Sequence, residues 1–162
     1  MGLLPRLIEA DYSMQAIVYD SQAEGHPLRL AEVEAPELKV GSLRVDVAAT
    51  AVNRADLMQR RGLYPPPKGA SPLLGLECSG VVREVAEGVE GWAPGDRVMA
   101  LLPGGGYAEE VVVDAGHCLR VPESVDLIEA AALPEVLLTV FLNVFQLAGL
   151  SDDDWLLVHG GG

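Results

Sequence analysis

The sequence predicts a mainly β protein with some α structure, in which a small, partly closed β-barrel is followed by the start of an α/β fold. Three observations support this fold class. Up to residue 113, short apolar segments alternate with turns rich in glycine and proline, which is typical of a compact barrel. After Pro122 the pattern changes to helical segments with recognisable starts. The chain then reaches an apolar run that enters three glycines.

The barrel is expected to consist of short strands. Six segments have the apolar content and bounding turns of strands, namely Gln15–Tyr19, Leu28–Glu34, Leu43–Ala51, Cys78–Val85, Arg97–Leu102 and Tyr107–Val113. The third alternates apolar and polar residues, which predicts a half-buried strand. A short helix is expected at Ala55–Arg61, where Gly62 ends it, and the prolines that follow predict a stiff loop at Leu63–Ser71.

A pair of helices is expected to follow the barrel. Asp126 and Glu129 have the spacing of a capping box, and Pro134 suits the first turn of a second helix that runs to about Leu147. Apolar residues cover nearly every direction of this second helix, so we expect it to be buried. The apolar run Trp155–Val158 is expected to be a buried strand.

The last strand leads into the glycines at residues 160–162, and an apolar strand followed by glycines is how a dinucleotide-binding βαβ unit begins. Glycines let backbone N–H groups approach a pyrophosphate at the next helix N-terminus. The match is short, and taken alone it fits a flexible tail or a turn better. Because a domain does not normally end on a buried strand without a partner, we expect the sequence to be truncated here.

Composition and charge exclude several classes of function. The net charge is −13, with 24 acidic and 11 basic residues and no basic cluster, so we expect no nucleic-acid binding. Cys78 and Cys118 are the only cysteines, and without a secretion signal they suggest reduced thiols in a cytoplasmic protein. Residues 130–150 carry one charge, Glu135, but a proline and amides interrupt them, so we expect no membrane span.

Four ordered motifs resemble the medium-chain dehydrogenase/reductase superfamily, namely Ala51–Pro67, Leu73–Val82, Gly95–Gly106 and Ala130–Thr139. Within it, the sequence is similar to the zinc-free quinone oxidoreductase branch, which includes p53-inducible and zeta-crystallin-like enzymes. This resemblance implies a GroES-like barrel over residues 14–125 and the beginning of a Rossmann NAD(P)-binding domain over 126–162, with the active site between them. Residues 1–13 are interpreted as a leader.

The resemblance also bears on metal binding. In zinc alcohol dehydrogenases of this superfamily, metal ligands would stand where this sequence has Asn53, Leu76 and Glu135. A leucine cannot bind Zn²⁺, and an asparagine amide is a poor substitute for a thiolate. The Cys-rich lobe of the structural zinc is missing as well. Gly104–Gly106 stand in its place and are interpreted as a tight link rather than a phosphate loop, because no helix follows them. We therefore expect no metal.

Candidate site residues follow from the same resemblance. It places a tyrosine that contacts cofactor or quinone at Tyr64 and a threonine near the nicotinamide carboxamide at Thr139. The expected catalytic residues are Tyr64 and Asn53. The expected cofactor-binding residues are Tyr64, Thr139, Gly160, Gly161 and Gly162. Each side chain has a structural alternative, since Tyr64 could be a surface residue, Asn53 could cap the following helix, and Thr139 could bond its own backbone.

The resulting hypothesis is metal-free transfer of a hydride from NADPH to a quinone, with NADH also open. A quinone suits this chemistry because it needs little carbonyl polarisation. The full-length protein is expected to be a homodimer, and this chain alone is expected to be inactive because the phosphate loop is cut at Gly162. Two alternatives stay open, a zinc-free enoyl-thioester reductase and a non-catalytic binding or structural protein.

Overall fold

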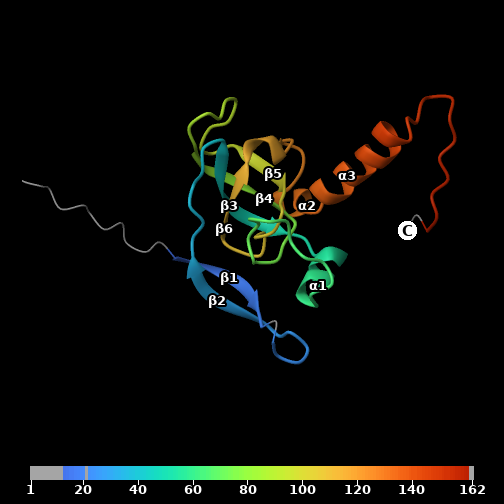
Figure 1. Ribbon diagram of the computed structural model, residues 1–162. Coiled ribbons are helices and arrows are strands. Elements are labelled where there is room, and N and C mark those ends of the chain that lie inside the picture. The colour runs from blue at the N-terminus through green and yellow to red at the C-terminus, as the bar shows by residue number, and fades with distance from the viewer. Residues whose placement is uncertain (1–12, 21, 161–162) are drawn as a thin grey trace, which may run out of the picture.

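The computed structural model describes residues 13–20 and 22–160. Its largest element is a five-stranded antiparallel sheet in the order β6-β3-β4-β5-β7 (Figure 1). These strands are β3 (Ser42–Thr50), β4 (Glu77–Val85), β5 (Arg97–Leu101), β6 (Glu110–Asp114) and β7 (Cys118–Arg120). A hairpin of β1 (Ser13–Tyr19) and β2 (Leu28–Glu34) forms a second sheet. The leader interpreted over residues 1–13 lies outside the described residues, except for Ser13, which begins β1.

Residues 107–109 join the two sheets. The Ile17 N–H donates to the Tyr107 carbonyl at 2.8 Å, and on the other side the Val47 N–H donates to the Glu109 carbonyl at 2.8 Å. Because one segment pairs with both β1 and β3, the sheets curl into a partly closed barrel, which confirms the predicted fold class. The strand expected at Tyr107–Val113 is therefore divided into this bridging segment and β6.

Apolar side chains from the inner face of the curled sheet fill the barrel. The main cluster consists of Leu43, Val45, Cys78, Val82, Val98, Ala100, Leu102, Val111 and Val113. The alternation expected for β3 is only partly observed, because Arg44 is buried too. Its guanidinium lies 3.3 Å from the Glu110 carboxylate and 3.5 Å from that of Glu84. A buried charge is tolerated when it is paired in this way.

The run Gly104–Gly106 packs backbone to backbone against the segment that leads into β4. The N–H groups of Gly105 and Gly106 donate to the carbonyls of Leu73 and Gly75 at 2.9 and 3.0 Å. A Cβ atom on Gly75 would lie 2.6 Å from the Gly106 Cα atom, so the contact requires glycine. These donors are engaged within the fold, and the predicted tight link is confirmed.

Helices occupy the remaining connections. They are α1 (Arg54–Arg60), the 3₁₀-helix η1 (Ala115–His117), α2 (Leu127–Ala130), α3 (Pro134–Val140) and the π-helix η2 (Phe141–Leu147). Asp126 caps α2, since its carboxylate accepts from the Ile128 N–H at 2.7 Å. The first turn of α3 contains Pro134, as predicted. Figure 1 shows α3 projecting away from the barrel.

Two predictions for the C-terminal part were wrong. The helix that ends at Leu147 has the predicted extent but is not buried, since Phe141 and Phe145 are half exposed. Trp155–Val158 is an exposed coil instead of a buried strand. In both cases the apolar pattern describes contacts that need a partner. Among the described residues, α3 contacts β4 and β5, but η2 packs mainly on α3, and Trp155–Val158 pairs with no strand.

Candidate functional site

Asp56 organises the start of α1. Its carboxylate accepts from the backbone N–H of Asn53 at 2.8 Å, which is half of the capping box at the beginning of this helix. The Gly75 N–H and the Tyr107 hydroxyl also donate to it, at 3.0 and 3.1 Å. Asp56 is only 1% exposed, and these three donors satisfy a buried carboxylate. They connect α1 to the loop before β4 and to the segment that joins the two sheets.

Of the three donors to Asp56, the Tyr107 hydroxyl is the one that can lose its proton. Burial and the adjacent Asp56 carboxylate both raise its pKa well above the ordinary value, because each disfavours the phenolate. Tyr107 therefore keeps its proton at neutral pH. It donates this proton to Asp56.

Glu77 is a second buried carboxylate, and it connects the barrel to α3. One oxygen, Oε1, accepts from Asn53 Nδ2 at 2.8 Å, and the other, Oε2, accepts from the Glu135 N–H at 2.9 Å. Because Pro134 has no N–H, Glu135 supplies the first backbone donor of the helix. A carboxylate can only accept, so the Asn53 amide must turn its NH₂ group toward Glu77.

The structure brings together two of the residues that resemblance singled out. Asn53 and Glu135, which are far apart in the sequence, meet at Glu77. Asn53 stands at the N-cap position of α1, where the structural alternative expected it, and its amide also bonds Glu77. Its catalytic role stays a prediction. Leu76, which precedes Glu77, contributes no polar side-chain atom.

The other predicted site residues lie apart from this cluster. Tyr64 is 44% exposed in the loop after α1, and Thr139 is exposed on α3. Neither side chain has a hydrogen bond to the cluster among the described residues. Gly160 follows the exposed coil with a positive φ of 65°, while Gly161 and Gly162 lie outside the described residues.

Sequence reasoning missed the role of Glu77 and the link from Asp56 to Tyr107. A signal for Glu77 existed, because it is the only charge in the apolar segment Leu73–Val82. A charge in such a segment indicates a buried carboxylate with dedicated donors. The partner of Tyr107 could not be read from the sequence, since 51 positions separate it from Asp56.

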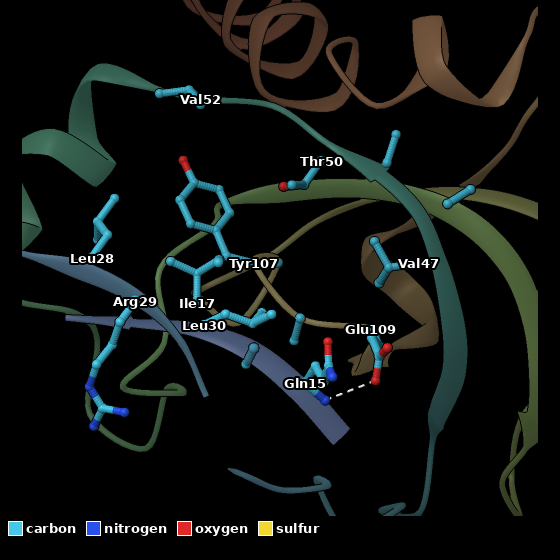
Figure 2. Close-up of a pocket in the computed structure, with 15 residues that line it drawn as sticks. Gln15, Ile17, Leu28, Arg29, Leu30, Val47, Thr50, Val52, Tyr107 and Glu109 are labelled. Carbon is cyan, nitrogen blue, oxygen red and sulfur yellow. Dashed lines mark hydrogen bonds between the residues drawn. The ribbon is translucent and has the colours of Figure 1, made fainter. Parts of the chain in front are cut away.

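An open hollow of about 640 Å³ lies between the β1–β2 hairpin and β3 (Figure 2). Its lining is mainly apolar and includes Ile17, Leu28, Leu30, Val47, Val52 and Tyr107. Figure 2 shows the Tyr107 ring standing in this hollow and pointing toward Val52. Tyr107 thus contacts both this hollow and the carboxylate that holds the start of α1.

Metal-ligating residues do not gather in the part of the chain that the structure describes. No three His, Cys, Asp or Glu side chains within it could hold a metal ion together. Burial raises the pKa of both the Cys78 and the Cys118 thiol to about 12, so both are neutral at pH 7. No helix among these residues is long and apolar enough to cross a membrane.

The profile of the alcohol dehydrogenase GroES-like domain family matches residues 39–123, about half of the chain. The chain belongs to the medium-chain dehydrogenase/reductase superfamily. This membership confirms the resemblance that the four sequence motifs carry. The barrel and its curled sheet are the GroES-like domain of that superfamily.

Relatives of several kinds share this domain. The mouse synaptic vesicle membrane protein VAT-1 homolog-like is 36% identical over 151 residues, which are 92% of this chain and 36% of that protein. The pikromycin polyketide synthase component PikAII of Streptomyces venezuelae is 42% identical over 130 residues, which are 80% of this chain and 3% of that protein. The solved structure of the quinone oxidoreductase from Coxiella burnetii matches with a TM-score of 0.75 at 27% identity, covering 88% of this chain and 47% of that one. The chain thus spans less than half the length of each of these relatives.

Proposed function

We propose that this chain supplies the substrate-binding barrel, residues 14–125, and the first part of the NAD(P)-binding domain, residues 126–162, of an NADPH-dependent quinone oxidoreductase that works without a metal ion. The observation that carries this proposal is the set of residues around Glu77. Two of the three positions at which zinc enzymes of the superfamily would place ligands, Asn53 and Glu135, are joined through hydrogen bonds to Glu77. The third is Leu76. This set contains neither a thiolate nor an imidazole, the ligands that Zn²⁺ prefers.

Two predicted residues that lie apart from this cluster offer groups that suit a nicotinamide and a planar substrate. Tyr64 offers a partly exposed aromatic face for stacking, and Thr139 offers an exposed hydroxyl to a carboxamide. A bound NADPH would supply the hydride, and a quinone becomes a hydroquinone by taking this hydride and one proton, which solvent provides. Asn53 would orient the ring through its amide, and such positioning is the main contribution of the protein.

A second candidate is reduction of an enoyl thioester, in which the hydride adds to an activated C=C bond. A solved enoyl reductase, CurK, shares this fold with a TM-score of 0.74, and the chain is 42% identical to a polyketide synthase component over 130 residues, which keeps this reaction as a candidate. Both reactions need the same cofactor and neither needs a metal in this site. The substrate therefore distinguishes them.

The test uses the polypeptide in which this chain continues into a complete NAD(P)-binding domain, called the full-length enzyme below. NADPH oxidation is measured with a naphthoquinone and with a crotonyl thioester. We expect turnover with the quinone. Turnover with the thioester alone would establish the second candidate, and the absence of both activities and of NADPH binding would indicate a non-catalytic protein. Residues 1–162 alone should show no turnover, because they span less than half of the quinone oxidoreductase that they resemble.

A variant pair tests the site itself. Tyr64→Ala in the full-length enzyme should reduce kcat/KM for the quinone by about 10-fold, since loss of one stacking face costs about 1.4 kcal/mol. The control is Leu63→Ala in the same loop, where the leucine is 66% exposed. We expect it to leave kcat/KM within about twofold of the parent, as surface substitutions usually do. Equal effects of the two substitutions would remove Tyr64 from the site.

A further inference from the structure

Two contacts fix the backbone of Glu77 in the barrel, independently of its side chain. The Thr50 hydroxyl donates to its backbone carbonyl at 2.7 Å, which ties the start of β4 to the end of β3. The same carbonyl lies against Gly106, where a Cβ atom would come within 2.9 Å of it. The backbone of Glu77 is therefore fixed from two directions, and the residue is only 2% exposed.

Both carboxylate oxygens of Glu77 are bonded within the fold. Oε1 accepts from the Asn53 amide and Oε2 from the Glu135 N–H, so each oxygen meets a donor. A buried carboxylate that lacks these donors would be strongly destabilised. The two donors belong to different parts of the protein, one to the barrel and one to the first turn of α3.

We infer that Glu77 is a positioning residue that fixes the Asn53 amide and the first turn of α3 in one geometry, so that substrate and nicotinamide meet in the same cleft. It acts through Asn53 and α3 and does not touch the reacting atoms. The catalytic consequence rests on the proposed function, while the hydrogen-bond geometry does not. Asn53 is held twice, since Asp56 fixes its backbone N–H and Glu77 fixes its side chain.

The substitution Glu77→Gln changes the hydrogen-bond donors and acceptors at this position and keeps the size of the side chain. In Glu77→Gln, the new amide has one acceptor and one donor in place of two acceptors. It can match both neighbours only if the Asn53 amide turns over, which takes the Asn53 oxygen away from the Asp56 N–H at the start of α1. The double variant Glu77→Gln with Asn53→Asp restores the match. There the new amide donates to the new carboxylate and still accepts from the Glu135 N–H. A control is Glu110→Gln, which changes another buried glutamate that pairs with Arg44.

The kinetic test uses the full-length enzyme with NADPH and a naphthoquinone. Glu77→Gln should lower kcat by about 10- to 100-fold, the range expected when a reacting group is slightly misplaced. The double variant should recover the melting temperature of the parent, because each donor again meets an acceptor, while kcat stays low because the Asn53 amide is gone. Glu110→Gln should lower the melting temperature and leave kcat within about twofold. If Glu77→Gln lowers only the melting temperature, as the control does, the inference is wrong. If this single variant does not fold, a folded double variant in which the Glu135 N–H exchanges as slowly as in the parent supports the inference, and a double variant that also fails to fold overturns it.

A second readout does not depend on activity. Amide ¹H–¹⁵N spectra of the full-length enzyme report the Asn53 side-chain NH₂ and the Glu135 N–H directly. Both should exchange slowly with solvent in the parent, and at least one should exchange faster in Glu77→Gln. If the parent reduces no quinone but these amides respond as expected, the proposed function fails and the geometry stands. If the parent is active and Glu77→Gln changes neither the spectra nor kcat, the positioning role fails.

Discussion

Asp56→Asn tests whether one carboxylate holds three parts of the barrel together. The substitution keeps the size of the side chain and removes one acceptor. The most favourable orientation of the new amide keeps its oxygen toward the Asn53 N–H and the Tyr107 hydroxyl, which both bond Oδ2. Its NH₂ group then faces the Gly75 N–H, and this buried donor loses its partner.

The magnitude follows from these contacts. An unpaired buried donor costs about 1–3 kcal/mol, and two hydrogen bonds lose the extra strength that a charged acceptor gives them. The free energy of unfolding should therefore fall by about 3–4 kcal/mol in Asp56→Asn. Tyr107→Phe removes one bond and leaves no buried N–H unpaired, so its cost should be about 1–2 kcal/mol. Asp126→Asn is the matched control, with a change of less than about 0.5 kcal/mol, because both residues cap a helix equally well.

Urea unfolding followed by circular dichroism measures these differences. With a slope of about 2 kcal/mol per molar urea, Asp56→Asn should shift the midpoint down by about 1.5–2 M. Asp126→Asn should leave the midpoint almost unchanged. If Asp56→Asn proves no more destabilising than Asp126→Asn, the three-donor account of Asp56 is refuted.

Three further predictions concern other parts of the chain. The Cys78 and Cys118 thiols should resist iodoacetamide at pH 8 when folded and react fully in urea. Because their folded pKa of about 12 lies above the ordinary 9.0, the unfolded chain loses these protons first, so the free energy of unfolding should fall as pH rises from about 9 to 12. Gly80→Ala should prevent soluble expression, since its Cβ atom would lie 2.0 Å from the Asp46 carbonyl oxygen, and recovery of folded protein would contradict this. Residues 1–162 alone should associate in sedimentation experiments through the exposed apolar face of α3 and η2, and Phe141→Ser should reduce this association.

The strands of the barrel could be predicted from the sequence because the residues within each segment determine where that strand begins and ends. Alternating apolar residues and turn glycines define β2 within its exact observed bounds, Leu28–Glu34, and α1 within one residue. The burial of the second helix and of Trp155–Val158 could not be predicted, because burial depends on a partner that the pattern itself does not supply. The hydrogen bonds of Glu77 escaped prediction for a related reason, since they join positions 24 and 58 residues apart.

We propose that this site transfers hydride to a quinone without a bound metal. The most direct measurement is the quinone-dependent oxidation of NADPH by the full-length enzyme, before and after exhaustive dialysis against a chelator, with the zinc content determined in parallel. We expect the same kcat before and after dialysis and far less than one zinc per chain. Loss of turnover on dialysis, with recovery on adding one equivalent of Zn²⁺, would contradict this proposal.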